Sequence, residues 1–107
     1  MIHTEILSIC LNYEHYNKVR RFIDKGMFNR DYGIVYTLIE KIHDKYPEKI
    51  LTLRELKVMH ADLYPAVPKA TKQNIVDTID ELDENSSISE LNFDAIKNFW
   101  ARQQAKE

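Results

Sequence analysis

Apolar residues recur at intervals of three and four along almost the whole chain, the spacing of one face of an α-helix. The clearest run is Val35, Leu38, Ile42 and Tyr46, and Pro47 ends it. The only strand candidate is "KILTL" at residues 49–53. With 2 Gly and 3 Pro in 107 residues, the chain has too few turn formers for a many-stranded β fold. We therefore expect an all-α fold, a small bundle of about six helices in a single domain.

Five further segments carry the helical spacing, and local signals mark several of their ends. Gly26 is expected to stop the second helix, and Thr52 with Glu55 forms a capping-box pattern at the start of the fourth. Thr71 is expected to begin the fifth helix and Asn92 to cap the sixth. The apolar positions of these segments are Ile2, Ile6, Ile9 and Tyr13; Tyr16, Val19 and Ile23; Leu56, Met59 and Leu63; Ile75, Ile79 and Leu82; and Phe93, Ile96 and Trp100.

The last two helices look different from the first four, because their apolar stripes are thin and their other faces polar. We expect residues 1–64 to form a helical head and residues 69–107 a helical hairpin of the same domain. The sequence ends in good helix formers without a cap, which is typical of a fragment of a longer protein. Two adjacent aromatic residues near the hairpin's end call for a covering surface. The expected self-association interface is therefore Ile79, Leu82, Ile96, Phe99 and Trp100.

The charge is unevenly distributed, although the net charge is only −2. Residues 1–30 hold five basic and three acidic side chains, with Arg20 and Arg21 adjacent. Residues 73–96 hold seven acidic side chains and no Lys or Arg. An acidic segment of this kind repels a phosphate backbone, so we expect weak or no binding of DNA by the isolated chain. The arginines are expected at a solvated edge, and the acidic run on a solvated helical face.

No pattern of catalytic or cofactor-binding residues is present. The sequence lacks a glycine-rich phosphate loop, so this chain is expected to neither bind nor hydrolyse ATP. Its four histidines fall on four different predicted helices, which argues against a metal site. Cys10 lies beside an apolar stripe and is expected to be a buried, unreactive thiol. We expect no catalytic, cofactor-binding or metal-binding residue in this chain.

Neither a signal peptide nor a membrane-spanning segment is predicted. The N-terminus has no basic region followed by a cleavage site, and no apolar run approaches the roughly 20 residues that span a bilayer. A cytoplasmic protein without membrane contact is the expectation.

The order of motifs in residues 5–56 resembles a known family. "EILS" at Glu5–Ser8 opens the first helix, Lys18-Val19 leads to Phe28 in a loop, and Leu51-Thr52-Leu53 follows Pro47 after a long helix. This order resembles the N-terminal domain of DnaB-type replicative DNA helicases, most of all their tailed-phage branch. Cellular members carry a Gly-Gly-x-x-Tyr-Leu stretch where this chain has "PAVPKATKQNIV", which favours the phage branch.

The resemblance implies a non-catalytic domain of a ring-shaped hexamer. In that family the N-terminal domains form a collar by pairing through their hairpins, and they contact primase and the helicase loader. ATP and Mg²⁺ would act in a separate motor domain of the parent protein, in the host cytoplasm. The alternative left open is a free-standing α-helical phage or bacterial adaptor, such as a transcription regulator.

Overall fold

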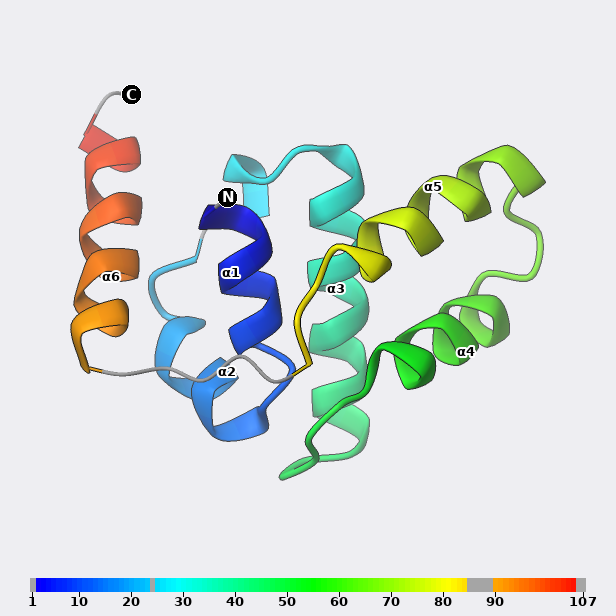
Figure 1. Cartoon of the computed structure of the whole chain (residues 1–107), viewed down its shortest axis with the longest axis horizontal. Helices are drawn as coiled ribbons and strands as arrows, with labels where there is room; N and C mark the ends of the chain where they lie inside the picture. The colour runs from blue at the N-terminus through cyan, green and yellow to red at the C-terminus, as the bar shows by residue number, and fades with distance from the viewer. Residues whose placement is uncertain (1, 24, 85–89, 106–107) are drawn as a thin grey trace.

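The computed structural model describes residues 2–23, 25–84 and 90–105 (Figure 1). Within these ranges the structure is all-helical, as predicted, and "KILTL" contributes only an isolated bridge from Ile50 to Asn12. The elements are α1 (Ile2–Ile9), α2 (Tyr13–Val19), a short 3₁₀ helix η1 (Lys25–Met27), α3 (Arg30–Lys45), α4 (Leu53–Leu63), α5 (Lys69–Asp80) and α6 (Glu90–Ala105).

The helix α3 runs through the centre of the molecule. It packs against α1, α4, α5 and η1, and Figure 1 shows α1 on one side of it and the α4–α5 pair on the other. Because neighbours cover it from several sides, its buried surface is wider than the single predicted stripe. The buried residues of α3 are Tyr32, Val35, Tyr36, Leu38, Ile39, Ile42 and His43.

Side-chain caps set the starts of three helices. The Asn12 side chain accepts hydrogen bonds from backbone N–H groups at the start of α2, and Asn29 does the same for α3. The predicted capping box of α4 is present. The Thr52 hydroxyl accepts a hydrogen bond from the backbone N–H of Glu55, and the Glu55 carboxylate accepts one from the backbone N–H of Thr52. These contacts satisfy N–H groups that have no partner inside the helix.

Three predicted helix boundaries differ from the structure. The second helix ends at Val19, well before Gly26, because the Phe22 N–H bonds to the Val19 carbonyl and turns the chain. The fifth helix begins two residues before Thr71, directly after Pro68, whose fixed φ suits a helix entry. Asn92 lies inside α6, which begins at Glu90, so it is not the cap of that helix.

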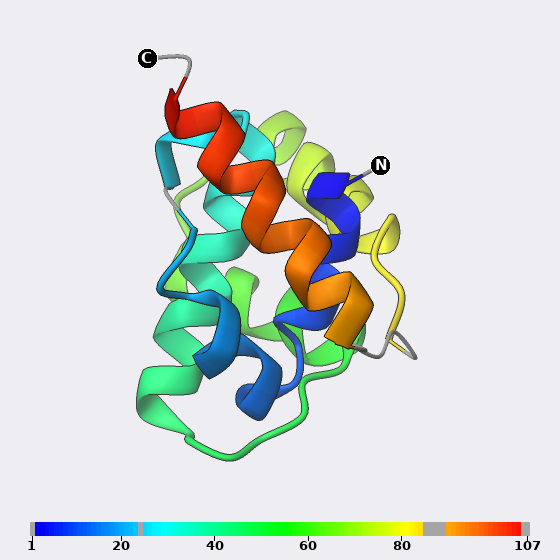
Figure 2. The ribbon, with the colours of Figure 1, turned by 90° about the vertical axis from the view of Figure 1, so that its left-hand side faces the viewer.

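The helical hairpin of the structure is formed by α4 and α5, one helix earlier than predicted. Residues 64–68 join these two helices, which pack against each other and against α3. The helix α6 lies on the opposite side of the molecule and crosses the face made by α1 and α2 (Figure 2). The reason is that the apolar stripes of α5 and α6 are buried against different partners in the head. Residues 85–89, which join α5 to α6, lie outside the described residues.

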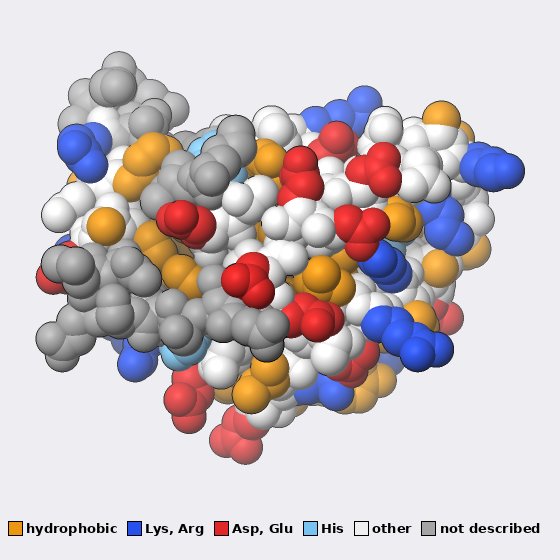
Figure 3. All heavy atoms as spheres, viewed as in Figure 1, with side chains coloured by type: hydrophobic (Ala, Val, Ile, Leu, Met, Phe, Trp, Pro, Cys, Tyr) orange, Lys and Arg blue, Asp and Glu red, His pale blue; other side chains and the backbone are white. Residues whose placement is uncertain are grey.

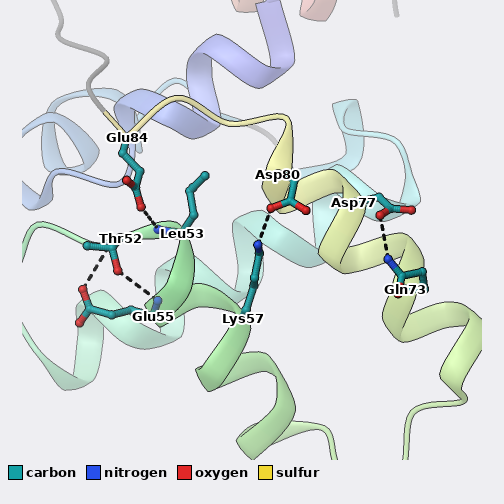
Figure 4. A network of polar contacts seen from close by, with 8 residues as sticks. All are labelled: Thr52, Leu53, Glu55, Lys57, Gln73, Asp77, Asp80 and Glu84. Carbon is teal, nitrogen blue, oxygen red and sulfur yellow. Dashed lines mark hydrogen bonds and ion pairs between the residues drawn. The ribbon is translucent and has the colours of Figure 1, made fainter.

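Polar contacts hold the first turns of α4 to the end of α5 (Figure 4). Lys57 forms an ion pair with Asp80, and the Leu53 N–H donates to the Glu84 carboxylate. Glu84 therefore acts as a second acceptor at the start of α4, where a negative charge is also favoured by the helix dipole. Part of the acidic run thus makes contacts within the chain, where the sequence predicted a solvated face.

Replacing Leu38 with alanine tests the central position of α3. Leu38 is fully buried, so Leu38→Ala should lower the free energy of unfolding by about 2–5 kcal/mol. Urea denaturation followed by circular dichroism measures the change. A loss below about 1 kcal/mol would contradict a packed core around this residue.

Candidate functional site

The structure does not bring the five predicted self-association residues onto one surface. Ile79 and Leu82 are buried on the α5 side, whereas Ile96 and Trp100 are buried on the α6 side (Figure 1). Phe99 is half-buried and packs against the core. Only Phe99 among the five therefore has appreciable surface to offer to a second chain. The side chain of Phe93, from the same predicted stripe, lies outside the described residues.

An aromatic cluster from the same chain covers Trp100. The Trp100 ring meets the Phe28 ring edge to face with 5.4 Å between centroids, and it stacks on His3 at 6.1 Å. Phe99 meets Trp100 at 5.4 Å. The sequence analysis expected a second chain to cover these aromatic residues, whereas α1 and the segment before α3 cover Trp100 in the structure. Trp100 is 1% exposed, so a partner is not required to cover it.

The charged segments singled out in the sequence do not form a site. Arg20 and Arg21 are exposed as predicted, and the Arg20 guanidinium lies 5.8 Å from the Tyr16 ring centroid. On the face seen in Figure 3, acidic side chains gather over α5 and the segment after it. Lysine and arginine side chains gather toward the end of the molecule where α5 begins. The two charge types are thus separated along the α4–α5 hairpin.

Two of the four histidines are buried, although the sequence suggested ordinary surface or boundary positions. His43 Nε2 lies 2.7 Å from the Cys10 carbonyl oxygen and must donate to it, which leaves Nδ1 as a buried acceptor without a partner among the described residues. Burial raises the pKa of the Cys10 thiol far above its usual range, so Cys10 is an unreactive core residue. No cluster of metal-ligating side chains occurs in the described ranges.

A pocket of about 440 Å³ lies between α3, α4 and α5. This volume falls within the range typical of ligand sites. Its apolar wall consists of Phe28, Ile34, Val67 and Ile75. Its polar lining comes mainly from Lys25, Asn29, Arg30, Thr37, His60, Tyr64 and Thr71. We call this the α3–α5 pocket, and none of its described lining residues is acidic.

Helical spacing in the sequence does not predict the α3–α5 pocket. The pocket depends on where the end of α4 and the start of α5 lie relative to the start of α3, which local spacing does not define. Two signals were available in retrospect. Gly33 lies just before the most regular predicted run, and His60 falls in the last turn of α4 beside its apolar stripe. Both residues line the pocket.

His60 is the most unusual polar group of this pocket. The residue is 2% exposed, and its Nδ1 has no hydrogen-bond partner among the described residues. Burial, together with the nearby charge of Lys72, lowers the pKa of His60, so the imidazole is neutral near pH 7. A buried nitrogen without a partner costs about 1–3 kcal/mol.

Comparisons of the chain with protein-family models, with curated proteins and with solved structures find no match. The likeness to DnaB-type helicase domains therefore depends on the residues quoted above. Among the described helices, none combines the length and the apolar character needed to cross a lipid bilayer.

Trp100→Ala should act on folding before it acts on any association. Loss of a buried tryptophan should lower the free energy of unfolding by about 3–5 kcal/mol. Phe99→Ala, at the neighbouring half-buried position, is the matched control and should cost less. Urea denaturation of both variants makes the comparison. Equal and small losses would contradict the placement of Trp100 in the core.

Stability should depend on pH between about 5 and 7, above the ordinary pKa of carboxyl groups. Burial lowers the pKa of His3, His15, His43 and His60 in the folded chain. The unfolded chain then binds more protons below its ordinary histidine pKa, so the free energy of unfolding should fall as the pH drops. Urea denaturation at several pH values measures this slope, which His60→Gln should make shallower. A slope of the opposite sign would contradict it.

Proposed function

We infer that this chain is a non-catalytic assembly domain, the N-terminal domain of a phage DnaB-type replicative helicase. In this role it joins subunits into a collar and contacts primase and the helicase loader. ATP and Mg²⁺ belong to the motor domain of the parent protein in this proposal.

One observation carries the proposal: the residues behind the resemblance converge on a single core. Ile6, Leu7 and Val19 are fully buried, and Phe28 and Leu51 are nearly so. Their convergence supports a pattern that encodes a fold.

The polar residues of the resemblance also have structural roles. The Ser8 hydroxyl donates to the Thr4 carbonyl and accepts from the Asp83 N–H at 2.9 Å, which ties α1 to the segment after α5. Thr52 begins α4 through its capping box. The serine and threonine of the quoted motifs are therefore positions where another residue type would lose a specific contact.

The proposed collar contact lies on the outer face of α6. Ala95, Phe99 and Arg102 follow one another at helical spacing, and Ala95 and Arg102 are exposed. This face replaces the five-residue interface expected from the sequence, four of whose members are buried. Pairing through a small face is weak in one domain, and a hexamer would strengthen it by avidity.

Sedimentation of the 107-residue chain at high concentration tests the collar contact. We expect reversible self-association that Phe99→Ala weakens about tenfold, as for a moderate interface anchor. Tyr46→Ala is the matched control, since Tyr46 is a 45% exposed aromatic residue at the end of α3. A strictly monomeric chain at hundreds of micromolar, or equal effects of both variants, would contradict the contact.

The helicase assignment itself is tested by the source gene. An open reading frame that continues past Glu107 into a glycine-rich phosphate loop with its lysine would support the proposal. A stop codon directly after Glu107 would contradict it and favour a free-standing adaptor or regulator.

A further inference from the structure

The α3–α5 pocket has features that the fold of the chain does not require. Gly33 lies in the first half of α3 and has no positive φ, so the backbone does not demand glycine there. A Cβ atom added at Gly33 would meet only the Phe28 Cβ, at an ordinary 3.8 Å. A glycine inside a helix costs about 1 kcal/mol relative to alanine. The missing side chain keeps the pocket wall open instead.

The pocket lining follows α3 over two successive turns. Arg30, Gly33, Ile34 and Thr37 line the pocket from two successive turns of α3, which span about 10 Å at 1.5 Å per residue. Residues four apart on α4 and on α5 line it in the same way. A groove with three helical walls and an apolar floor suits an amphipathic helix that inserts side chains at helical spacing.

The charges around the pocket favour an acidic ligand. Arg30 lines the pocket, is exposed, and has no ion-pair partner among the described residues. Lys25 also lines it, although Glu40 at 2.6 Å offsets its charge. Lys41 donates to the hydroxyl of the lining residue Tyr64 at 2.6 Å. The chain as a whole is acidic, so this concentration of cations is local.

Unpaired hydrogen-bonding groups lie at the same place. The first turn of α5 has no side-chain cap, because Pro68 precedes it, and Thr71 of that turn lines the pocket. His60, which is 2% exposed, also lines the pocket and has an unpartnered Nδ1. This nitrogen is covered by other atoms of the chain, so Arg30 and the start of α5 are the polar groups that the pocket offers to a ligand.

From these observations we propose that the α3–α5 pocket binds an acidic amphipathic helix of a partner protein. Large apolar side chains of the partner cover Phe28, Ile34 and Val67. A partner carboxylate lies between Arg30 and the start of α5. This inference is independent of the helicase assignment, because it rests on the pocket and not on α6 or on the resemblance.

Nuclear magnetic resonance titration of the isotope-labelled chain with two synthetic peptides tests the proposal. The first peptide, of about 12 residues, has leucine at helical spacing and glutamate elsewhere on the adjoining face. The second has glutamine in place of every glutamate. We expect the acidic peptide to shift the amide signals of Gly33 and Thr71 and the imidazole signals of His60. The glutamine peptide should bind about tenfold more weakly.

Four variants locate the binding. Arg30→Gln should weaken the acidic peptide about tenfold, whereas Arg54→Gln, an exposed arginine of α4 outside the pocket, should leave it unchanged. Gly33→Leu should block the pocket, whereas Gly33→Ala adds one methyl group and should bind nearly as well. Circular dichroism verifies the fold of each variant. If Gly33→Leu unfolds, Gly33→Ala still tests the pocket, because it should bind the acidic peptide nearly as well as the unchanged chain does.

Four results would overturn the inference. The first is the absence of saturable shifts at millimolar peptide, and the second is equal affinity for the two peptides. The third is an equal loss in Arg30→Gln and Arg54→Gln, which would indicate a general charge effect. Shifts at the pocket that grow with protein concentration alone would identify a second copy of this chain as the occupant and would also overturn it. None of these results bears on the gene test of the helicase assignment.

Discussion

Burial of α3 from several sides is the interaction on which the rest of this structure depends. Leu38 and Ile39 are fully buried next to each other in sequence, which a helix achieves only with partners on more than one side. The helix α1 covers one side, and the α4–α5 hairpin covers another. Other elements cover α3 on two faces. The position of each remaining element therefore follows from its contacts with α3 or with the elements that pack against α3.

The placement of α6 follows from aromatic packing and not from chain order. Trp100 needs a large apolar surface, and Phe28 with His3 provides one. The stripe of α5 is already covered by α3 and α4. The two C-terminal helices therefore separate, although each has the composition of a hairpin partner. This separation changes the self-association hypothesis, because it leaves Phe99 and its exposed neighbours as the available face of α6.

The α4–α5 hairpin combines two unlike ends. At one end, Lys57 with Asp80 and Glu84 with the Leu53 N–H hold the helices together. At the other end, the last turn of α4 and the first turn of α5 line the α3–α5 pocket. Polar contacts at one end therefore fix the hairpin while the other end stays open to a ligand. The two proposed surfaces, the outer face of α6 and the α3–α5 pocket, are therefore separate.

The sequence by itself determined which segments form helices and which apolar residues lie at the centre of each buried helix face. The spacing of Val35, Leu38 and Ile42 predicted α3, and Thr52 with Glu55 predicted the start of α4, because both signals lie within one or two helical turns. Helix ends were less predictable where packing of the chain decides the turn. The second helix, for example, ends at Val19 and not at Gly26. Only the tertiary structure decided that α4 and α5 form the hairpin, that Trp100 is a core residue, and that Gly33 and His60 meet in one pocket. Those outcomes depend on which faces cover one another across the chain, and the spacing of residues within a helix carries no information about its partner.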